Sequence, residues 1–391
     1  MVEEWRHTEI PMKAGTLFAV LVLLGSLISP QLGPPTDIAP LWSHEVIEDF
    51  GYNHDQHFRP DVRLDNEGTG VVFLGEQELI VYALQPSGRL SSRVSHEISS
   101  GFRLRLHVLD AQTGKERLSK DVSVRSHGSA VQVTAGGILV NTGEVIKLFS
   151  ADFSKVKNLT SPTNGVEGWL SNVSPTGTTI LANRFNVKTN SSYLTVFDAR
   201  TLEPKFSWNS PLLLNNCSIS DRRIAALENG FVVRSDFGRT SWETIGKGAG
   251  ICGGNVPIFY SDDALVYGCT KLIAASVEGG TLMAEELPRE VRVLAKKAVA
   301  QKEQRVAVSL HTVEVKKHLL TEPSSRATAI HIAVYDLSQK KRILTVSVAP
   351  LPKNDYDFAL SPDGSKLAVL NDRRASVYSV PVPASNGGAA Q

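Results

Sequence analysis

The sequence predicts an all-β fold built from a repeated unit of short antiparallel strands. In residues 359–380, ALSPDGSKLAVLNDRRASVYSV, apolar and polar side chains alternate in three short runs, as they do in half-buried strands. The turn-forming sequences Ser-Pro-Asp-Gly and Asn-Asp-Arg-Arg separate the runs. The end of this unit, an apolar strand that stops at an acidic or small residue before a turn, recurs along the chain. Three strands this short cannot bury a core alone, so the unit must be one of a set.

Seven copies of this strand end can be placed. Three are clear, LHVLDAQTGKERL, LTVFDARTLEPKF and IAVYDLSQKKRIL, and their strands end at Asp110, Asp198 and Asp336. Weaker copies lie at 148–152, 232–236 and 273–277, and Tyr378 marks the last unit. Neighbouring markers are 38 to 58 residues apart. Seven units follow, and because the weak copies are degenerate, six or eight units are the alternatives.

The unit resembles a blade of the WD40-like or TolB-like (YVTN-type) bacterial β-propellers, whose blades often carry Ser-Pro-Asp-Gly followed by an apolar strand. The spacing of the markers agrees with a blade period of roughly 40 to 45 residues. The resemblance spans about residues 40 to 380 and implies an all-β, seven-bladed β-propeller of four-stranded blades, with the propeller proper at 62–381. It implies a fold and no particular chemistry.

The two ends of the chain suggest how the ring closes. The clear units have a fourth strand after the marker, such as 117–124, but the last unit stops at Val380 and runs into Pro381 and Pro383. Residues 41–47, LWSHEVI, form an alternating segment without a unit of their own, within a linker at 36–61. We expect this N-terminal strand to complete the last blade and remove the open sheet edges. Residues 382–391 have the composition of a disordered tail.

Residues 1–35 are interpreted as a signal peptide or a membrane anchor that precedes the fold. Residues 14–28 are uninterrupted by charge, follow Lys13 and are succeeded by Pro30, Pro34 and Pro35. This pattern predicts export, to a periplasmic or extracellular location, and leaves cleavage and anchoring both open. On this interpretation, the protein contacts the membrane only through its N-terminal segment.

The charge balance and the missing motifs argue against nucleic-acid binding and against the common enzyme classes. The chain has 391 residues, with 41 basic and 40 acidic side chains and a net charge of +1, so no global field favours nucleic acid. The catalytic and cofactor motifs that sequence patterns reveal, such as the GxSxG elbow, the P-loop, HExxH and CxxCH, are missing from the sequence. We therefore expect no cofactor, and we expect a monomer.

Two long insertions indicate a binding face. Each lies between the second and third strands of its blade, at 85–101 in the first blade and 316–326 in the sixth, and loops of this class emerge on one face of a propeller. Blade seven alone separates the two blades, so the insertions could meet and form a basic rim that attracts an acidic partner. The rim residues are Arg89, Arg93, His96, Lys316, Lys317, His318 and Arg326. The alternative is that both insertions are unrelated solvated hairpin tips.

The cysteines and histidines offer weaker signals. Cys252 and Cys269 flank a predicted strand pair and could form a disulfide in an exported domain, or could be buried free thiols. Cys217, on an inner strand, would stay unpaired. His54, Asp55 and His57 could present metal ligands, but without a third distant ligand we interpret them as part of a polar surface loop and predict no metal site.

Two functional hypotheses follow. The first is an exported, non-catalytic propeller that binds or scaffolds an unknown protein, peptide or cell-envelope partner. The alternative is a propeller enzyme, quinoprotein-dehydrogenase-like or hydrolase-like, with an active site on the central axis, because propeller enzymes assemble their sites from many blades.

Overall fold

The computed structural model describes most of the chain between residues 38 and 381. The described ranges are 38–46, 69–86, 102–124, 131–142, 145–160, 169–186, 191–212, 214, 217–247, 256–316, 324–352 and 356–381. Residues 1–35, the histidine cluster and the tail at 382–391 lie outside them. Within these ranges, no helix has the length and apolar character needed to cross a membrane.

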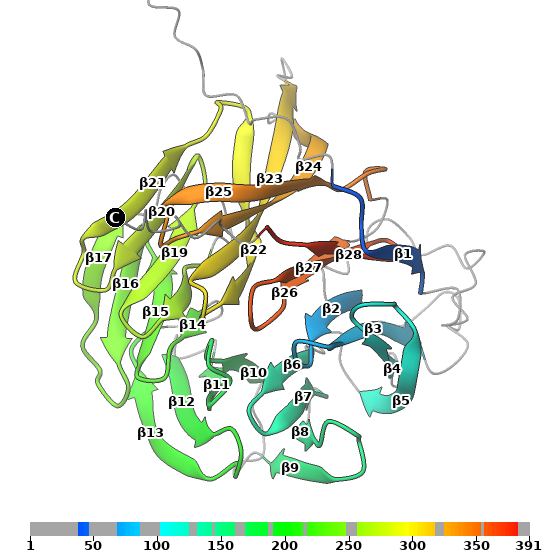
Figure 1. The fold of residues 1–391 in the computed structure, drawn as a ribbon. Helices are drawn as coiled ribbons and strands as arrows, with labels where there is room; N and C mark the ends of the chain where they lie inside the picture. The colour runs from blue at the N-terminus through cyan, green and yellow to red at the C-terminus, as the bar shows by residue number, and fades with distance from the viewer. Residues whose placement is uncertain are drawn as a thin grey trace, which may run out of the picture.

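The described residues form seven four-stranded antiparallel sheets, which are the blades of a β-propeller (Figure 1). Blade one consists of β2 (Thr69–Phe73), β3 (Glu78–Pro86), β4 (Phe102–Asp110) and β5 (Glu116–Val124). Blade two consists of β6 (Val131–Thr134), β7 (Gly137–Asn141), β8 (Val145–Phe149) and β9 (Val156–Thr160). Blade three consists of β10 (Trp169–Val173), β11 (Thr179–Asn186), β12 (Ser191–Asp198) and β13 (Pro204–Ser210). Blade four consists of β14 (Cys217–Ile219), β15 (Arg223–Glu228), β16 (Phe231–Asp236) and β17 (Glu243–Lys247).

The remaining blades complete the ring. Blade five consists of β18 (Ile258–Ser261), β19 (Ala264–Gly268), β20 (Lys271–Ser276) and β21 (Thr281–Glu286). Blade six consists of β22 (Val291–Ala300), β23 (Arg305–Lys316), β24 (Ser324–Asp336) and β25 (Lys341–Ser347). Blade seven consists of β26 (Tyr356–Leu360), β27 (Lys366–Asn371), β28 (Arg374–Ser379) and β1 (Trp42–Glu45). The predicted count of seven is therefore confirmed.

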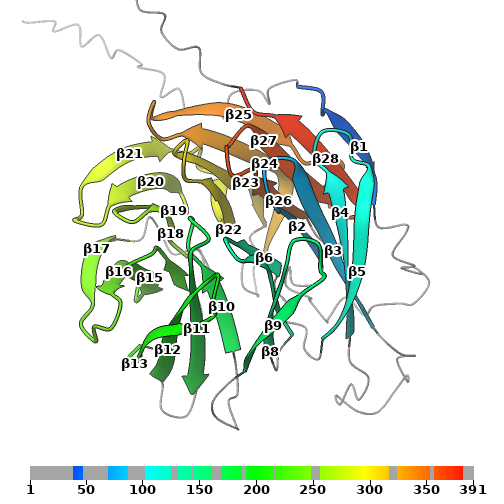
Figure 2. The same ribbon diagram turned by 60° about the horizontal axis from the view of Figure 1, so that its bottom comes forward.

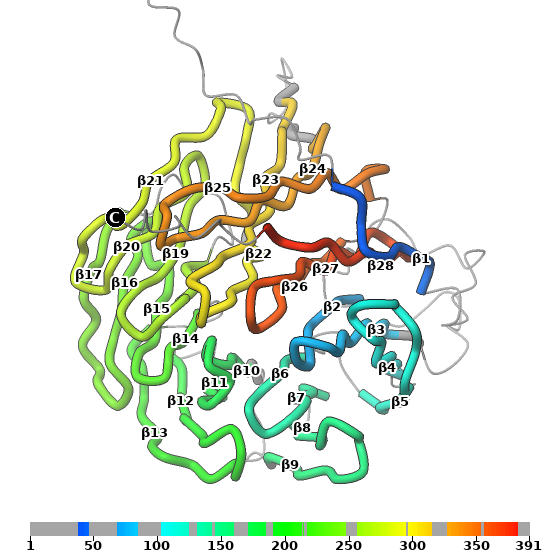
Figure 3. The backbone as a smooth tube through the Cα atoms, viewed as in Figure 1, coloured from blue at the N-terminus to red at the C-terminus, as the bar shows by residue number. Residues whose placement is uncertain are grey.

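The first strand of every blade lies at the centre of the ring. Each of these strands contacts the first strands of the two neighbouring blades, in the order β2, β6, β10, β14, β18, β22, β26 and back to β2. The tube in Figure 3 follows the chain around this ring, with the N-terminal strand β1 returning beside β28. Apolar side chains fill the space between successive blades, for example those of blades one and two around Leu104 and Ile138.

The markers of the sequence repeat are turn-forming residues. The carboxylate of Asp110 accepts backbone N–H bonds from Gln112 and Thr113, and Asp198 does the same for Arg200 and Thr201. The Thr113 hydroxyl lowers the pKa of Asp110, and the N–H of Arg200 lowers that of Asp198. In the weak copy at 148–152, β8 already ends at Phe149, because Ser150 and Asp152 form the turn.

A second recurring turn joins the first and second strands. In the Ser-Pro-Asp-Gly sequence the Ser361 hydroxyl accepts the Lys366 N–H (2.9 Å), and Gly364 has a φ of 65° with the Arg305 side chain close by. A serine occupies the same place in blades three, four and five, where Ser174, Ser220 and Ser261 accept backbone N–H bonds. We call the face that carries these turns the turn face. The opposite face, which carries the connections between second and third strands, is the loop face.

The N-terminal strand closes the ring as predicted. β1 pairs antiparallel with β28, from Trp42 opposite Val377 to Glu45 opposite Arg374. Figure 2 shows β1 between β28 and the outer strands of blade one. The Trp42 indole donates to the Ala111 carbonyl oxygen (3.0 Å), so the strand that completes blade seven also binds blade one. Ile38, just upstream, packs against the core between blades six and seven.

This closure yields a stability prediction. Deleting residues 1–48 should lower the melting temperature strongly, because loss of the Trp42 contacts alone costs about 3–5 kcal/mol and opens the ring at blade seven. Deleting residues 1–35 should leave the melting temperature of the described fold nearly unchanged. Thermal melts of the two truncated proteins check the prediction, and equal melting temperatures would contradict it.

Candidate binding face and axial cluster

The loop face carries the two hairpins that the sequence singled out. The strands β23 and β24 have 12 and 13 residues, and β3 and β4 have nine each, against six each in the corresponding strands β27 and β28. Blade seven lies between them, because β26 contacts β22 on one side and β2 on the other. The two long hairpins therefore stand on either side of blade seven.

Only part of the predicted rim falls within the described ranges. Lys316 ends β23 with its backbone opposite Ser324, and Arg326 lies in β24 opposite Glu314. Both positions are at the loop-face end of the hairpin. The other five rim residues lie outside the described ranges: Arg89, Arg93, His96, Lys317 and His318. That the two insertions come together to form one rim therefore stays a prediction.

Sequence reasoning missed two arginines on this face. Arg373 lies in the short connection between β27 and β28 of blade seven, and Arg374 begins β28. Arg374 is exposed, and its guanidinium lies 3.6 Å from a Glu45 carboxylate oxygen. The signal was present in the Asn-Asp-Arg-Arg turn, because that turn joins the second and third strands. It therefore lies on the same face as the two insertions and between them.

At the centre of the ring, one buried carboxylate joins three blades. Asp357, on the first strand of blade seven, accepts the Val71 N–H of blade one and the Phe358 N–H of its own strand, each at 2.8 Å. It also forms an ion pair with the Lys296 ammonium of blade six. Asp357 is 3% exposed, so its charge is compensated within the protein, as a buried charge requires.

A bulge in β22 aims Lys296 at this carboxylate. Val293 pairs with Leu310 and Lys297 with Val308, so residues 294–296 lie opposite the single residue Ser309. The next side chain, Lys297, points to the other neighbour and donates to the Val256 carbonyl oxygen before β18 (2.9 Å). Burial lowers the pKa of the Lys297 ammonium to about 7. The two lysines therefore join blade six to blades seven and five.

A hydroxyl–imidazole group lies beside this cluster. The Tyr356 hydroxyl is 2.7 Å from the Ser309 hydroxyl and 2.6 Å from Nε2 of His311. Burial lowers the pKa of His311 to about 4, so the ring is neutral at physiological pH. Ser309 is fully buried, and the three side chains bond the second strand of blade six to the first strand of blade seven.

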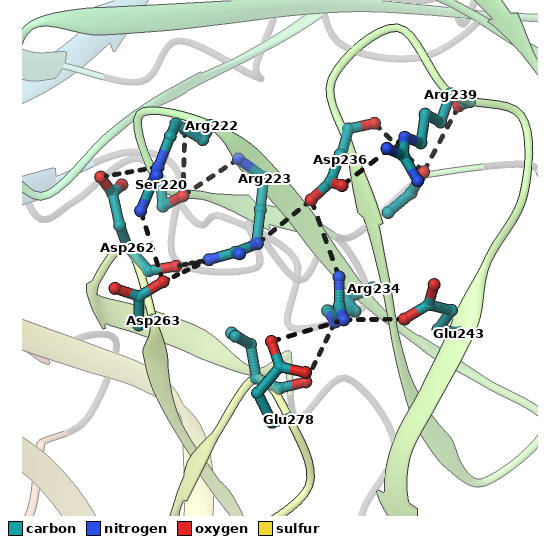
Figure 4. A network of polar contacts seen from close by, with 12 residues as sticks. Ser220, Arg222, Arg223, Arg234, Asp236, Arg239, Glu243, Asp262, Asp263 and Glu278 are labelled. Atoms are coloured by element: carbon teal, nitrogen blue, oxygen red, sulfur yellow. Dashed lines mark hydrogen bonds and ion pairs between the residues drawn. The ribbon is translucent and has the colours of Figure 1, made fainter.

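On the turn face, arginines and carboxylates connect blades four and five (Figure 4). Arg223 bonds Asp236 of its own blade (3.1 Å) and Asp263 of blade five (2.6 Å). Arg234 pairs with Glu243 (2.7 Å) and donates to the Val277 carbonyl oxygen across the blade boundary (3.0 Å). Because these guanidinium groups already face carboxylates, this surface has little charge left for a ligand.

The described ranges include two of the three cysteines, Cys217 and Cys269, and none of the candidate metal ligands His54, Asp55 and His57. Cys269 is disulfide-bonded, and Cys217 is a free thiol that is buried in β14, as expected. Cys252 lies outside the described ranges, so its pairing with Cys269 stays a prediction. No group of three or more His, Cys, Asp or Glu side chains suited to a metal occurs among the described residues.

Comparisons with known proteins define the fold class. No protein-family model matches the chain, and no curated protein sequence does. The WD40 domain of Neurospora crassa Pan2 is similar in structure, with a TM-score of 0.52 and 12% identity over 90% of this chain and 98% of that one. A chain of a mitotic checkpoint complex is similar with a TM-score of 0.50 and 10% identity, over 89% and 98%. At such identities the likeness shows the fold alone, a WD40-like seven-bladed propeller, and the TolB-like assignment stays a prediction.

The buried Lys297 yields a pH prediction. Its pKa in the folded protein, about 7, lies below its usual value of 10.5, so the unfolded chain binds the proton more tightly and the fold loses stability as the pH falls from 10.5 to 7. Lys297→Met removes this loss. We expect a gain of about 1–3 kcal/mol in the free energy of unfolding at pH 7, shrinking toward pH 10.

Urea unfolding of both proteins between pH 6 and 10 measures this difference. Lys271→Met is the control, because Lys271 is 40% exposed and pairs with Glu286 on the outer strands of blade five. A variant at Lys297 with the same pH slope as the parent, or one less stable at every pH, would contradict the prediction.

Proposed function

We propose that the protein is an exported, non-catalytic binding or scaffolding propeller that holds an acidic protein or cell-envelope partner on its loop face. One observation carries the proposal: the two longest second-to-third-strand hairpins stand on either side of blade seven. Both are basic in sequence, and blade seven adds Arg373 and Arg374 between them. A locally positive face on a protein of net charge +1 favours an acidic partner without a general attraction for anions.

Export has its own support. The uncharged residues 14–28 have the composition of a signal-peptide core or anchor. Cys269 is disulfide-bonded, and structural disulfides persist in oxidising compartments outside the cytoplasm. We propose a periplasmic or extracellular location, with a TolB-like role in the envelope as the finer form of this proposal.

The alternative function is an enzyme with an axial active site. It is favoured by the bulge of β22, which places Lys296 and Lys297 at the centre of the ring, and by the lowered pKa of Lys297. The contacts argue for the binding module, because Lys296, Asp357, Tyr356 and His311 are already bonded to neighbouring blades. These side chains hold the ring together in the geometry described.

The rim can be tested by changing Arg89, Arg93, Lys316 and Lys317 to serine. We expect these charges of the predicted insertions to be exposed, so the melting temperature should change little, because exposed charges contribute little to stability. Capture of the partner from envelope extract should weaken, most strongly at low salt, because exposed charges act through screened long-range attraction.

The matched control changes four exposed basic residues on or near the turn face, Lys115, Lys155, Lys205 and Arg239. This control should recover the partner as the parent does. If the rim variant recovers the same proteins equally well at low and high salt, the rim is solvated surface and the axial cluster becomes the better site.

Location can be tested separately with a reporter fused after Gln391. Two reporters are fused in parallel, one that is active only in an oxidising, exported compartment and one that is active only in the cytoplasm, and we expect activity from the first alone. Activity from the cytoplasmic reporter alone would rule out the exported location and leave the binding face to be tested on its own.

A further inference from the structure

The loop face of blade seven holds an exposed apolar loop next to its two arginines. We propose that Leu351, Arg373 and Arg374 form a docking surface for an extended acidic segment of a partner protein that carries an apolar side chain. This inference rests on the function proposed above and names both the centre of the face and the chemistry of its ligand.

The apolar part is the connection between blades six and seven. Ala349, Pro350 and Leu351 are exposed, and Leu351 is 37% exposed. The Asn371 side chain donates to the Pro350 carbonyl oxygen (2.8 Å), which fixes this loop to the end of β27. Pro350 and Pro352 restrict the backbone further. Because the loop is already held in place, little conformational freedom is lost when a partner covers Leu351.

The charged part is the connection that follows Asn371. Two arginines stand here against one aspartate, Asp372. Among the described residues, Arg373 has no carboxylate within ion-pair distance, and Arg374 has only the exposed pair with Glu45 at 3.6 Å. An exposed pair of this kind contributes little, so a partner carboxylate can replace Glu45 at low cost. This contrasts with the arginines of the turn face, which are held between several carboxylates.

The neighbouring hairpins limit the shape of the ligand. The second and third strands of blade six have about twice as many residues as the six-residue strands of blade seven, which lets them continue roughly 20 Å beyond it. Those of blade one are three residues longer than the strands of blade seven. A broad globular surface would meet these hairpins first, whereas an extended chain can reach Leu351 and the arginines between them. Guanidinium groups bind carboxylates in paired hydrogen bonds, which selects acidic side chains.

A synthetic peptide tests the proposal directly. The full chain, purified in mild detergent, is titrated into a fluorescein-labelled peptide EEDELDEEG, and binding is followed by fluorescence anisotropy. Arg373→Gln combined with Arg374→Gln should weaken binding about tenfold at low salt, with a smaller effect at high salt. Leu351→Ser should weaken binding about three- to tenfold at both salt concentrations, because it removes apolar contact.

Matched controls come from other surfaces of the chain. Arg239→Gln changes an arginine that is 65% exposed and pairs with Asp236 on the turn face. Leu282→Ser changes a leucine that is 40% exposed on the outer strand β21. Both should bind the peptide as the parent does. The peptide KKKKLKKKG should bind far more weakly than EEDELDEEG, and EEDEGDEEG should bind about three- to tenfold more weakly, because it lacks the apolar side chain.

The outcomes separate this inference from the proposed function. If the acidic peptide binds and only the four-residue rim variant loses it, the proposed function stands and this docking surface is wrong. If the acidic peptide binds neither the parent chain nor its variant Glu48→Gln with Asp49→Asn, this docking surface is overturned, and capture of the partner by the rim variant decides the proposed function on its own. A third outcome concerns the acidic residues that follow β1 in the sequence, Glu48 and Asp49. If the peptide binds only after these are changed to Gln and Asn, the segment of this chain, and not a partner protein, is the occupant of the surface.

Discussion

Closure of the ring is the constraint on which the rest of the structure depends. Each blade buries its apolar faces only against its two neighbours, so an open ring would expose the facing surfaces of blades seven and one. Two sets of contacts close the ring between blades seven and one, one at its outer edge and one at its centre. On the outside, β1 completes blade seven, and its Trp42 bonds Ala111 of blade one. At the centre, Asp357 accepts the Val71 N–H, so the last blade is also bonded directly to the first strand of the first one.

The blades between these contacts are connected by repeated polar turns as well as by apolar packing. On the turn face, the Thr176 hydroxyl of blade three bonds Asp221 of blade four, and Asp262 of blade five accepts the Asp221 N–H. Farther round, Arg305 of blade six donates to the Gly364 carbonyl oxygen of blade seven. Each of these bonds has at least one partner in a turn between the first and second strands of a blade. The same turn therefore shapes a blade and connects it to its neighbour.

Charge is distributed unequally between the two faces, although the chain as a whole is nearly neutral. On the turn face, arginines such as Arg223 and Arg234 each contact more than one carboxylate and serve the blade boundaries. On the loop face, Arg374 has one exposed partner. A surface whose charges are paired internally resists recruitment by a ligand, whereas weakly paired arginines beside an exposed leucine suit an interface.

The sequence alone predicted the strand ends at Asp110, Asp198 and Asp336 and the closing role of residues 41–47, because turn residues and period-two alternation are local signals. It favoured seven blades over six or eight, and the seven sheets of the structure decided the count. The sequence also placed the two long insertions on one face. It carried a signal for Arg373 and Arg374, because their turn joins a second and a third strand, but only the structure shows how few carboxylates face them. The sequence could not show the axial cluster. Asp357, Val71 and Lys296 are far apart in sequence, and only ring closure and the bulge of β22 bring a carboxylate, a backbone N–H and an ammonium together.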